Sequence, residues 1–417
     1  MGFAIGCLIL LGNASLFLPT IERGESASAV MIAGTTGIFT VWAMSGMEVP
    51  MVAFLVTLTV LLHIRFSGRK SLIAVGLCAA LTTMVRPEFV LLFAVLLADR
   101  LCRDRRGAAW FVLGFGGLYA PYFLWRLVTY GWLFPNTFYC KVGASTGQLG
   151  RGFDYLGLFC WPALLLLALL VVGLVGRSRI PAFLFAYFAL HLVYVVAVGG
   201  DVMPAARFFA PLMPILGLMA AISLHDFARG PGAVVLMVGV ILAFNLAHSY
   251  ANPHIHHQGK VGLHGTEVGI YLRDNLPPDT LLATSTAGSV AYWSRLPVID
   301  MFGLTDEHIA HRDLNIGRGN PGHEKHDGKY VLDRKPGAIM FGSYGIEEPV
   351  FRGDHEIARD QRFQQYTKKS HRLPSGRRLF VYYRNVEEEE VKVEPPPTGR
   401  RGKAKANGDR GKAKRRR

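Results

Sequence analysis

The chain has 417 residues, 51% of them hydrophobic and 18% charged, with a formal net charge of +15. It is too apolar for an ordinary water-soluble domain of this length and too charged for a wholly embedded one. The positive charge does not indicate a nucleic-acid-binding protein, because Thr398 to Arg417 alone carry ten Lys/Arg against one Asp, a net +9 that leaves +6 for the rest. The five cysteines follow no disulfide or metal-binding spacing.

Apolar runs long enough to cross a hydrocarbon core recur from Met1 to about Ala247. Each run predicts a helical span, although some pairs of runs can also form broken or partial spans. The candidate spans lie at residues 2–19, 28–44, 48–64, 71–85, 88–99, 107–125, 155–175, 180–198, 208–224 and 232–249.

The composition therefore divides the chain into three parts. We expect a polytopic α-helical membrane bundle with about eight to ten spans at residues 1–251. A small α/β extracytoplasmic domain is expected at 252–385 and a disordered, acidic-then-basic tail at 386–417. The tail is either a solvated arm or a segment that adheres to anionic head groups or an acidic cell-surface polymer.

The basic residues of the short loops predict the orientation of the bundle in a plasma membrane, since Lys and Arg favour the cytoplasmic side. Alternating loops divide these residues into a set of eleven and a set of five. The larger set is Arg23, Arg65, Arg69, Lys70, Arg100, Arg103, Arg105, Arg106, Arg177, Arg179 and Arg229; the smaller set is Arg86, Arg126, Lys141, Arg151 and Arg207. The smaller set, and the domain that follows the last span, are therefore expected outside.

Two short polar turns interrupt apolar runs on the predicted outer side. In Arg86-Pro87-Glu88 the proline cannot continue a helix, so the two charges flank a tight turn. They either satisfy each other or leave Arg86 free to bind a phosphate. Glu48, in Ser45-Gly46-Met47-Glu48, either caps the helix that follows it or contacts substrate.

Two longer outer segments carry further candidates. The stretch from Trp132 to Lys141 is either an interfacial aromatic belt or a re-entrant loop in which Asn136 and Lys141 contact a sugar or phosphate. Asp201 and Arg207 either form an internal salt bridge or act on substrate. In the second case Asp201 binds a substrate hydroxyl or a divalent cation, and Arg207 faces a lipid-linked phosphate.

The segment after the last span has the pattern of a small α/β module. Its predicted strands are Leu281 to Ser285, Pro297 to Asp300, Ala338 to Phe341 and Arg378 to Tyr383, and its predicted helices include Thr266 to Asn275 and Lys329 to Arg334. His and carboxylate residues, including Asp306 and His323, gather in its loops at spacings that match no standard zinc site. They are expected to hydrogen-bond within loops or to contact an acceptor; no cofactor is certain, although a divalent cation is possible.

The order of these motifs resembles the multi-pass GT-C glycosyltransferases, in particular the actinobacterial arabinofuranosyltransferases of the AftB type. The matching elements are Ser45-Gly46-Met47-Glu48, Arg86-Pro87-Glu88, Leu133 to Lys141, Gly199 to Phe208, Ile299 to Asp306 and Gly322-His323-Glu324-Lys325. The resemblance implies a GT-C-like bundle and an inverting transfer of a sugar, with arabinofuranose as the first candidate. It implies a polyprenyl-phosphate donor and a cell-envelope polysaccharide acceptor outside the plasma membrane.

The same resemblance implies a catalytic aspartate in the first outer loop, and no acidic residue precedes Glu22 here. The family pattern is thus expected to begin upstream of Met1, or else Asp201, Glu48 or Glu88 takes the carboxylate role. Two alternatives stay open. The chain could be a catalytically incomplete membrane protein that binds a lipid donor or a glycan, or a component of a transporter for lipid-linked precursors.

Overall fold

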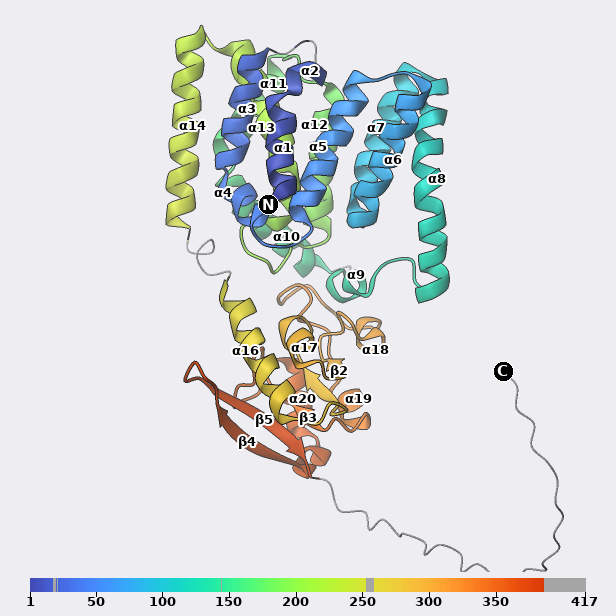
Figure 1. The fold of residues 1–417 in the computed structure, drawn as a ribbon, viewed down its shortest axis with the longest axis vertical. Coiled ribbons are helices and arrows are strands. Elements are labelled where there is room, and N and C mark those ends of the chain that lie inside the picture. Colours follow the sequence, from blue (N-terminus) through green and yellow to red (C-terminus); the bar gives the residue numbers. More distant parts are fainter. Residues whose placement is uncertain (18–19, 21, 144, 253–258, 386–417) are drawn as a thin grey trace, which may run out of the picture.

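A computed structural model describes residues 1–17, 20, 22–143, 145–252 and 259–385. The described chain is mostly helical, with a small mixed sheet in its C-terminal part. Figure 1 shows a helical bundle followed by a smaller unit that contains the sheet. The predicted tail, residues 386–417, lies outside the described residues.

The helices of the first part follow the apolar runs of the sequence. They are α1 (Gly2–Gly12), α2 (Ala14–Phe17), α3 (Arg23–Thr35), α4 (Gly37–Ala43), α5 (Val49–Arg65), α6 (Arg69–Val85), η1 (Pro87–Phe89), α7 (Val90–Arg103), α8 (Arg105–Tyr130), α9 (Asn136–Lys141), α10 (Thr146–Cys160), α11 (Leu164–Val175), α12 (Ala182–Ala197), η2 (Arg207–Leu212), α13 (Met213–Phe227) and α14 (Pro231–Ala251). Pro87 ends the preceding helix as predicted, because its ring is incompatible with an uninterrupted helix.

The described helices that could cross a membrane are fewer than the ten predicted runs. Three are long and apolar enough, namely α8, η2 with α13, and α14. The count rises to five if two bent pairs, α3 with α4 (71°) and α10 with α11 (93°), each form one span. The predicted run 155–175 is thus two helices rather than one straight span, because the chain turns between Cys160 and Leu164.

The central helix of the bundle is η2–α13. Within an 18-residue apolar stretch of η2–α13, 94% is buried. The corresponding share is only 17% in α8 and in α14, which therefore expose apolar faces. Small residues permit the tight packing: a Cβ on Gly217 would lie 2.9 Å from Cβ of Ala33 in α3, and a Cβ on Gly152 would lie 2.2 Å from the Val196 carbonyl of α12. The centre of the bundle is therefore a close-packed frame that fixes the loops at its ends.

The two sets of basic residues lie at opposite ends of the bundle. The turns between α5 and α6, between α7 and α8, and between α13 and α14 gather at the end away from the sheet (Figure 1). At that end Arg179 bridges the carboxylates of Glu25 and Asp226. The turns that carry Glu48 and Arg86 lie at the end that faces the C-terminal unit (Figure 1).

The C-terminal unit has its own hydrophobic cores around a five-stranded sheet of order β2-β1-β3-β5-β4. Its elements are α16 (Gly259–Asn275), β1 (Leu282–Thr284), α17 (Ser289–Ser294), β2 (Val298–Asp300), α18 (Glu307–Ala310), α19 (Gly328–Asp333), β3 (Ala338–Ile339), α20 (Arg352–Arg359), η3 (Gln361–Gln365), β4 (Tyr366–Arg372) and β5 (Arg378–Arg384). β1 pairs in parallel with β2 and β3, while β5 is antiparallel to β3 and β4. The four predicted strands are confirmed, and β4 was not predicted.

Candidate functional site

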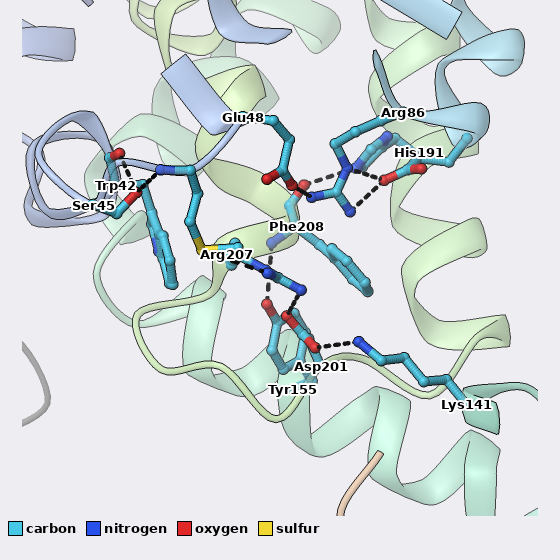
Figure 2. A network of polar contacts seen from close by, with 12 residues as sticks. Trp42, Ser45, Glu48, Arg86, Lys141, Tyr155, His191, Asp201, Arg207 and Phe208 are labelled. Atoms are coloured by element: carbon cyan, nitrogen blue, oxygen red, sulfur yellow. Dashed lines mark hydrogen bonds and ion pairs between the residues drawn. The ribbon is translucent and has the colours of Figure 1, made fainter. Parts of the chain in front are cut away.

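Six charged side chains from four separate parts of the chain pair with one another at the end of the bundle that faces the C-terminal unit; Figure 2 labels all of them except Glu88. Each is set by the end of a helix or by a tight turn. They are Glu48 before α5, Arg86 after α6, Glu88 in η1, Lys141 at the end of α9, Asp201 in the loop after α12, and Arg207 at the start of η2. The sequence predicted all six as candidate site residues, and the fold brings them together.

Arg86 lies between two carboxylates. Its Nη1 is 2.9 Å from Oε1 of Glu48, and its Nη2 is 2.5 Å from Oε1 of Glu88. Its guanidinium carbon also lies 5.0 Å from the centre of the Phe208 ring, a cation–π distance. The internal Arg86–Glu88 pair, one of the two interpretations from sequence, is therefore formed. Glu48, which precedes α5, is a second carboxylate partner of Arg86. Of the two acids, Glu48 is the more accessible, with 35% of its side chain exposed against 9% for Glu88.

Asp201 holds a second pair of cations. Its Oδ2 is 2.5 Å from Nη2 of Arg207, and its Oδ1 is 3.5 Å from Nζ of Lys141. The Asp201 carboxylate is fully buried, whereas Lys141 keeps 24% of its side chain exposed. The internal salt bridge predicted as one alternative is thus present. Lys141 is the cation with the longest contact and the most exposure, so it has the most donor capacity left for a ligand.

The loop that carries Asp201 is held in an unusual backbone conformation. Gly199 and Gly200 have φ values of +78° and +68°, and Ala205 and Ala206 have values of +52° and +47°. A left-handed conformation at a residue with a Cβ costs about 1–2 kcal/mol, so the surrounding contacts must impose it. One such contact is the indole Nε1 of Trp42, which donates to the Ala205 carbonyl at 3.1 Å. Backbone strain of this kind clusters at functional sites.

Neighbouring polar groups fix the start of η2 beyond this loop. The Tyr155 hydroxyl accepts a hydrogen bond from the Phe208 N–H at 3.1 Å. On the other side, Nε2 of His191 lies 3.0 Å from the Phe208 carbonyl. Tyr155 and His191 come from α10 and α12, so two helices position the residue that directly follows Arg207. Sequence analysis did not single out either residue, since each lies inside an apolar run.

A pocket of about 440 Å³ opens beside the six charges. Its volume is in the range of small-molecule sites. Most of its wall is apolar or aromatic, and its polar lining includes Arg86, Arg207 and Lys141. The other lining residues are Glu48, Pro87, Glu88, Val90, Leu91, Phe134, Pro135, Thr137, Phe138, Val142, Tyr194, Val198, Gly200 and Phe208. The pocket thus combines three cations and two acids with a hydrophobic wall.

Four predicted substrate-binding residues do not line this pocket. One is Asp201, which pairs with the lining residues Lys141 and Arg207; the other three are Asn136, Asp306 and His323. Asn136 starts α9 and faces a neighbouring cavity that it shares with Trp132 and Glu307. Asp306 caps α18 by accepting the Ile309 N–H at 3.1 Å, which is a structural role. His323 packs edge-on against Phe302, with ring centres 4.6 Å apart, and burial lowers its pKa.

Arg151 and Glu324 join the C-terminal unit to the site. Nη1 of Arg151 is 2.8 Å from Oε2 of Glu324, and its Nε donates to the Gly199 carbonyl at 3.0 Å. Oε1 of Glu324 also accepts the N–H groups of three successive residues, Gly317, Arg318 and Gly319. The sequence motif that contains Glu324 was noticed, but its partner Arg151 was counted only as a loop charge.

Hydrogen bonds stabilise the ionised form of the Glu324 side chain. Burial raises its pKa, but the hydrogen bonds from the Gly319 N–H, the Arg151 side chain and the Gly317 N–H together outweigh burial and bring the pKa below its ordinary value. The carboxylate is therefore the form that holds the C-terminal unit against α10.

A possible divalent cation was among the expectations. In the part of the chain that the structure describes, no group of three or more His, Cys, Asp or Glu side chains is arranged to hold a metal ion. The acids of the candidate site are instead paired with Arg86, Arg207 and Lys141.

Comparison with known proteins gives one match. Residues 252–386 match the model of a family described as a domain of unknown function, DUF8728. The match covers the C-terminal unit and not the helical bundle. No curated protein and no solved structure matches the chain.

Proposed function

We propose that this protein is a membrane glycosyltransferase that binds a polyprenyl-phosphate sugar in the pocket beside Arg86, Lys141 and Arg207. In this proposal it transfers the sugar, with arabinofuranose as the first candidate, to a cell-envelope glycan on the outer side of the plasma membrane. The observation that carries the proposal is the composition of the pocket, in which three cations and the acids Glu48 and Glu88 border a mostly apolar wall. A polyprenyl phosphate has the complementary chemistry, an anionic head on an apolar chain.

A bilayer around the bundle is supported by the apolar faces of α8 and α14. Val128 of α8 is 87% exposed and Val235 of α14 is 72% exposed. Contiguous apolar surface on long helices is costly in water and indicates contact with another apolar phase. The eleven-to-five distribution of basic loop residues favours the orientation in which the pocket opens outside.

The proposed chemistry is a single displacement. An acceptor hydroxyl oxygen attacks the anomeric carbon of the donor, the bond from that carbon to the phosphate oxygen breaks, and the phosphate leaves with the electron pair. Lys141 and the two arginines stabilise the leaving phosphate. The acceptor proton passes to a carboxylate, for which Glu48 is the best of the three candidate acids because it is the most exposed. Asp201 is paired with two cations and instead positions them.

The test is transfer by the full chain reconstituted in liposomes with polyprenyl-phosphate donors that carry pentose or hexose. We expect release of polyprenyl phosphate together with a glycosylated acceptor. Lys141→Ala should weaken donor binding by about 10- to 100-fold, because a hydrogen bond to a charged group contributes about 1.5–3 kcal/mol. Lys329→Ala changes an exposed lysine of α19 and is the matched control.

The outcomes separate the proposal from its alternatives. Binding of the donor without transfer would indicate a catalytically incomplete donor-binding protein. Movement of the lipid between leaflets without transfer would indicate a transporter component. Failure of the full chain to bind any polyprenyl-phosphate donor would overturn the proposal.

A further inference from the structure

The segment from Trp132 to Val142 lies between the helical bundle and the C-terminal unit. It contains α9, and Figure 1 shows this short helix between the two parts. The segment supplies six of the residues that line the candidate pocket, namely Phe134, Pro135, Thr137, Phe138, Lys141 and Val142. The described residues of the C-terminal unit do not themselves line the pocket. The unit therefore reaches the pocket indirectly, through the contacts that it makes with this segment.

Helix α9 is too short to be stable by itself. It has six residues, Asn136–Lys141, and the residue before it is Pro135, whose side chain cannot cap the first N–H groups. Helix formation has a costly first turn, and isolated helices much shorter than about 12 residues are not stable in water. Contacts with other parts of the chain must therefore hold α9 in place.

The C-terminal unit holds this segment at its entrance, through Trp132. The indole ring of Trp132 stacks on the imidazole ring of His311, with ring centres 3.7 Å apart. Its Nε1 also donates to Oε1 of Glu307 at 2.7 Å. Glu307 is the first residue of α18 and His311 directly follows this helix. The Tyr139 ring of α9 lies 4.1 Å from the same imidazole ring, so His311 contacts aromatic rings both before and within α9.

Two further contacts lie within α9 and just after it. Cys140 is fully buried, and its thiol donates to the Phe302 carbonyl at 3.5 Å. The Ser145 hydroxyl, at the start of α10, donates to the Ile316 carbonyl at 2.6 Å. The C-terminal unit therefore contacts the chain before, within and after the short helix.

These contacts bear directly on Lys141. Lys141 follows the buried Cys140, and its Nζ lies 3.5 Å from Oδ1 of Asp201. A displacement of α9 of one or two ångströms would therefore move the ammonium group away from the carboxylate and change the wall of the pocket. The position of this cation depends on how firmly α9 is held.

We propose that the C-terminal unit completes the candidate pocket, because its grip on Trp132 positions α9 and with it Lys141. Trp132 does not line the pocket and is thus a positioning residue. The inference rests on the proposed function for the identity of the anion that Lys141 binds, whereas the positioning of α9 can be measured without a ligand. The domain matched at residues 252–386 then has a role in this chain, which is to hold one wall of the site.

The first test measures hydrogen exchange of the full chain in nanodiscs without ligand. The amides of Phe138 and Val142 donate to the carbonyls of Pro135 and Phe138 and report on α9. Trp132→Ala should speed their exchange by about tenfold or more, because α9 opens more easily once a contact that holds it is lost.

Trp293→Ala is the matched control for this measurement. Trp293 lies in α17 of the C-terminal unit and is 39% exposed against 37% for Trp132, but its ring contacts Tyr292. Its removal should leave the exchange of α9 unchanged. Unchanged exchange in Trp132→Ala, or an equal acceleration by the two substitutions, would overturn the inference.

The second test measures binding of a sugar-free polyprenyl phosphate to the same preparations. Trp132→Ala should weaken binding by about tenfold, the lower end of the loss expected for Lys141→Ala. In a chain that already carries Lys141→Ala, the same Trp132 substitution should have little further effect, because residues that act through one another are not additive. A general loss of stability would weaken binding equally in both backgrounds, and that result would overturn the inference.

The two tests separate this inference from the proposed function. If the unaltered chain binds no polyprenyl phosphate, the proposed function fails. The exchange of the α9 amides still decides whether the C-terminal unit positions this wall of the pocket.

Discussion

Arg207 and Asp201 form an ion pair of 2.5 Å in which the carboxylate is fully buried and 8% of the arginine side chain is exposed. Removing one partner of a buried pair leaves the other charge without compensation, at a cost of about 3–5 kcal/mol. We therefore predict that Asp201→Asn lowers the free energy of unfolding by that amount. Thermal unfolding of the detergent-solubilised protein, followed by circular dichroism, measures the change.

The matched control is an exposed pair in the C-terminal unit. Asp274 lies 2.8 Å from Arg273, and both side chains are substantially exposed. Exposed pairs contribute about 0–1 kcal/mol, so Asp274→Asn should have little effect. Equal losses from the two substitutions would show that burial does not set the strength of the Asp201 pair.

Gly200 is the second sensitive position in the same loop. Its φ is +68°, and a Cβ there would lie 2.5 Å from Cβ of Tyr155. Gly200→Ala thus combines an unfavourable backbone conformation with a clash against a residue that positions η2. We predict a loss of unfolding free energy of about 2 kcal/mol or more, measured by the same thermal unfolding.

Gly376 separates the two contributions, because it has a φ of +84° but a Cβ there would meet no atom within 4 Å. Gly376→Ala should cost only the backbone term, about 1–2 kcal/mol. If Gly200→Ala were no more destabilising than Gly376→Ala, the close approach of Tyr155 would not restrict the loop.

The distance along the chain explains which contacts of the site were predictable. The pairs Arg86–Glu88 and Asp201–Arg207 join residues that are close in sequence, and both were foreseen as possible internal pairs. The contacts of Arg86 with Glu48 and of Lys141 with Asp201 depend on how helices far apart in the sequence pack. A single sequence contains no signal for that packing, so it indicated the members of the site but not all of their partners.

The fold shows the same difference between features that depend on neighbouring residues and features that depend on contacts between distant segments. The apolar runs predicted most helices, but hydropathy cannot detect the 93° bend between α10 and α11, since both sides of the bend are apolar. Strand β4 was missed because its side chains are mostly exposed and show no apolar alternation. It forms only because β5 offers a free edge for pairing.

The Glu324 contact predicts a dependence on pH. Burial raises the pKa of Glu324, but hydrogen bonds from Gly319 and Arg151 bring it below its ordinary value of 4.5. A lowered pKa means that the contact is complete above this value and is lost as the pH falls through the lower pKa of the folded state. We predict that the amides of residues 317–319, which donate to Glu324, exchange hydrogen faster as the pH falls below 4.5, after correction for intrinsic exchange.

Two controls accompany this measurement. Glu324→Gln should abolish the extra acceleration at low pH, because the amide side chain does not titrate in this range. The Met340 amide donates to Ala283 within the sheet and should stay protected over the same pH range. Equal acceleration at Met340 would mean that the whole unit opens, and no acceleration at 317–319 would mean that Glu324 does not hold this loop.

The orientation of the bundle can be tested with thiols at its two ends. Cys102 is exposed at the end of α7, beside basic residues predicted to lie inside. Tyr292 of α17 is 75% exposed in the C-terminal unit, so Tyr292→Cys introduces a reactive thiol at the opposite end. In intact cells a membrane-impermeant maleimide should label the peptide with the introduced thiol and not that of Cys102, as detected by mass spectrometry after proteolysis. Permeabilisation should add labelling of Cys102, because the reagent then reaches both ends.

Two other labelling patterns would contradict the predicted orientation or the presence of a membrane. Labelling of Cys102 alone in intact cells would invert the orientation and place the candidate pocket on the cytoplasmic side, where an extracytoplasmic glycan could not reach it. Labelling of both thiols in intact cells would show that no bilayer separates the two ends of the bundle. The remaining cysteines are buried or partly buried and react slowly, since thiol labelling depends on exposure. The expected pattern therefore requires both a membrane around the helices and the C-terminal unit on its outer side.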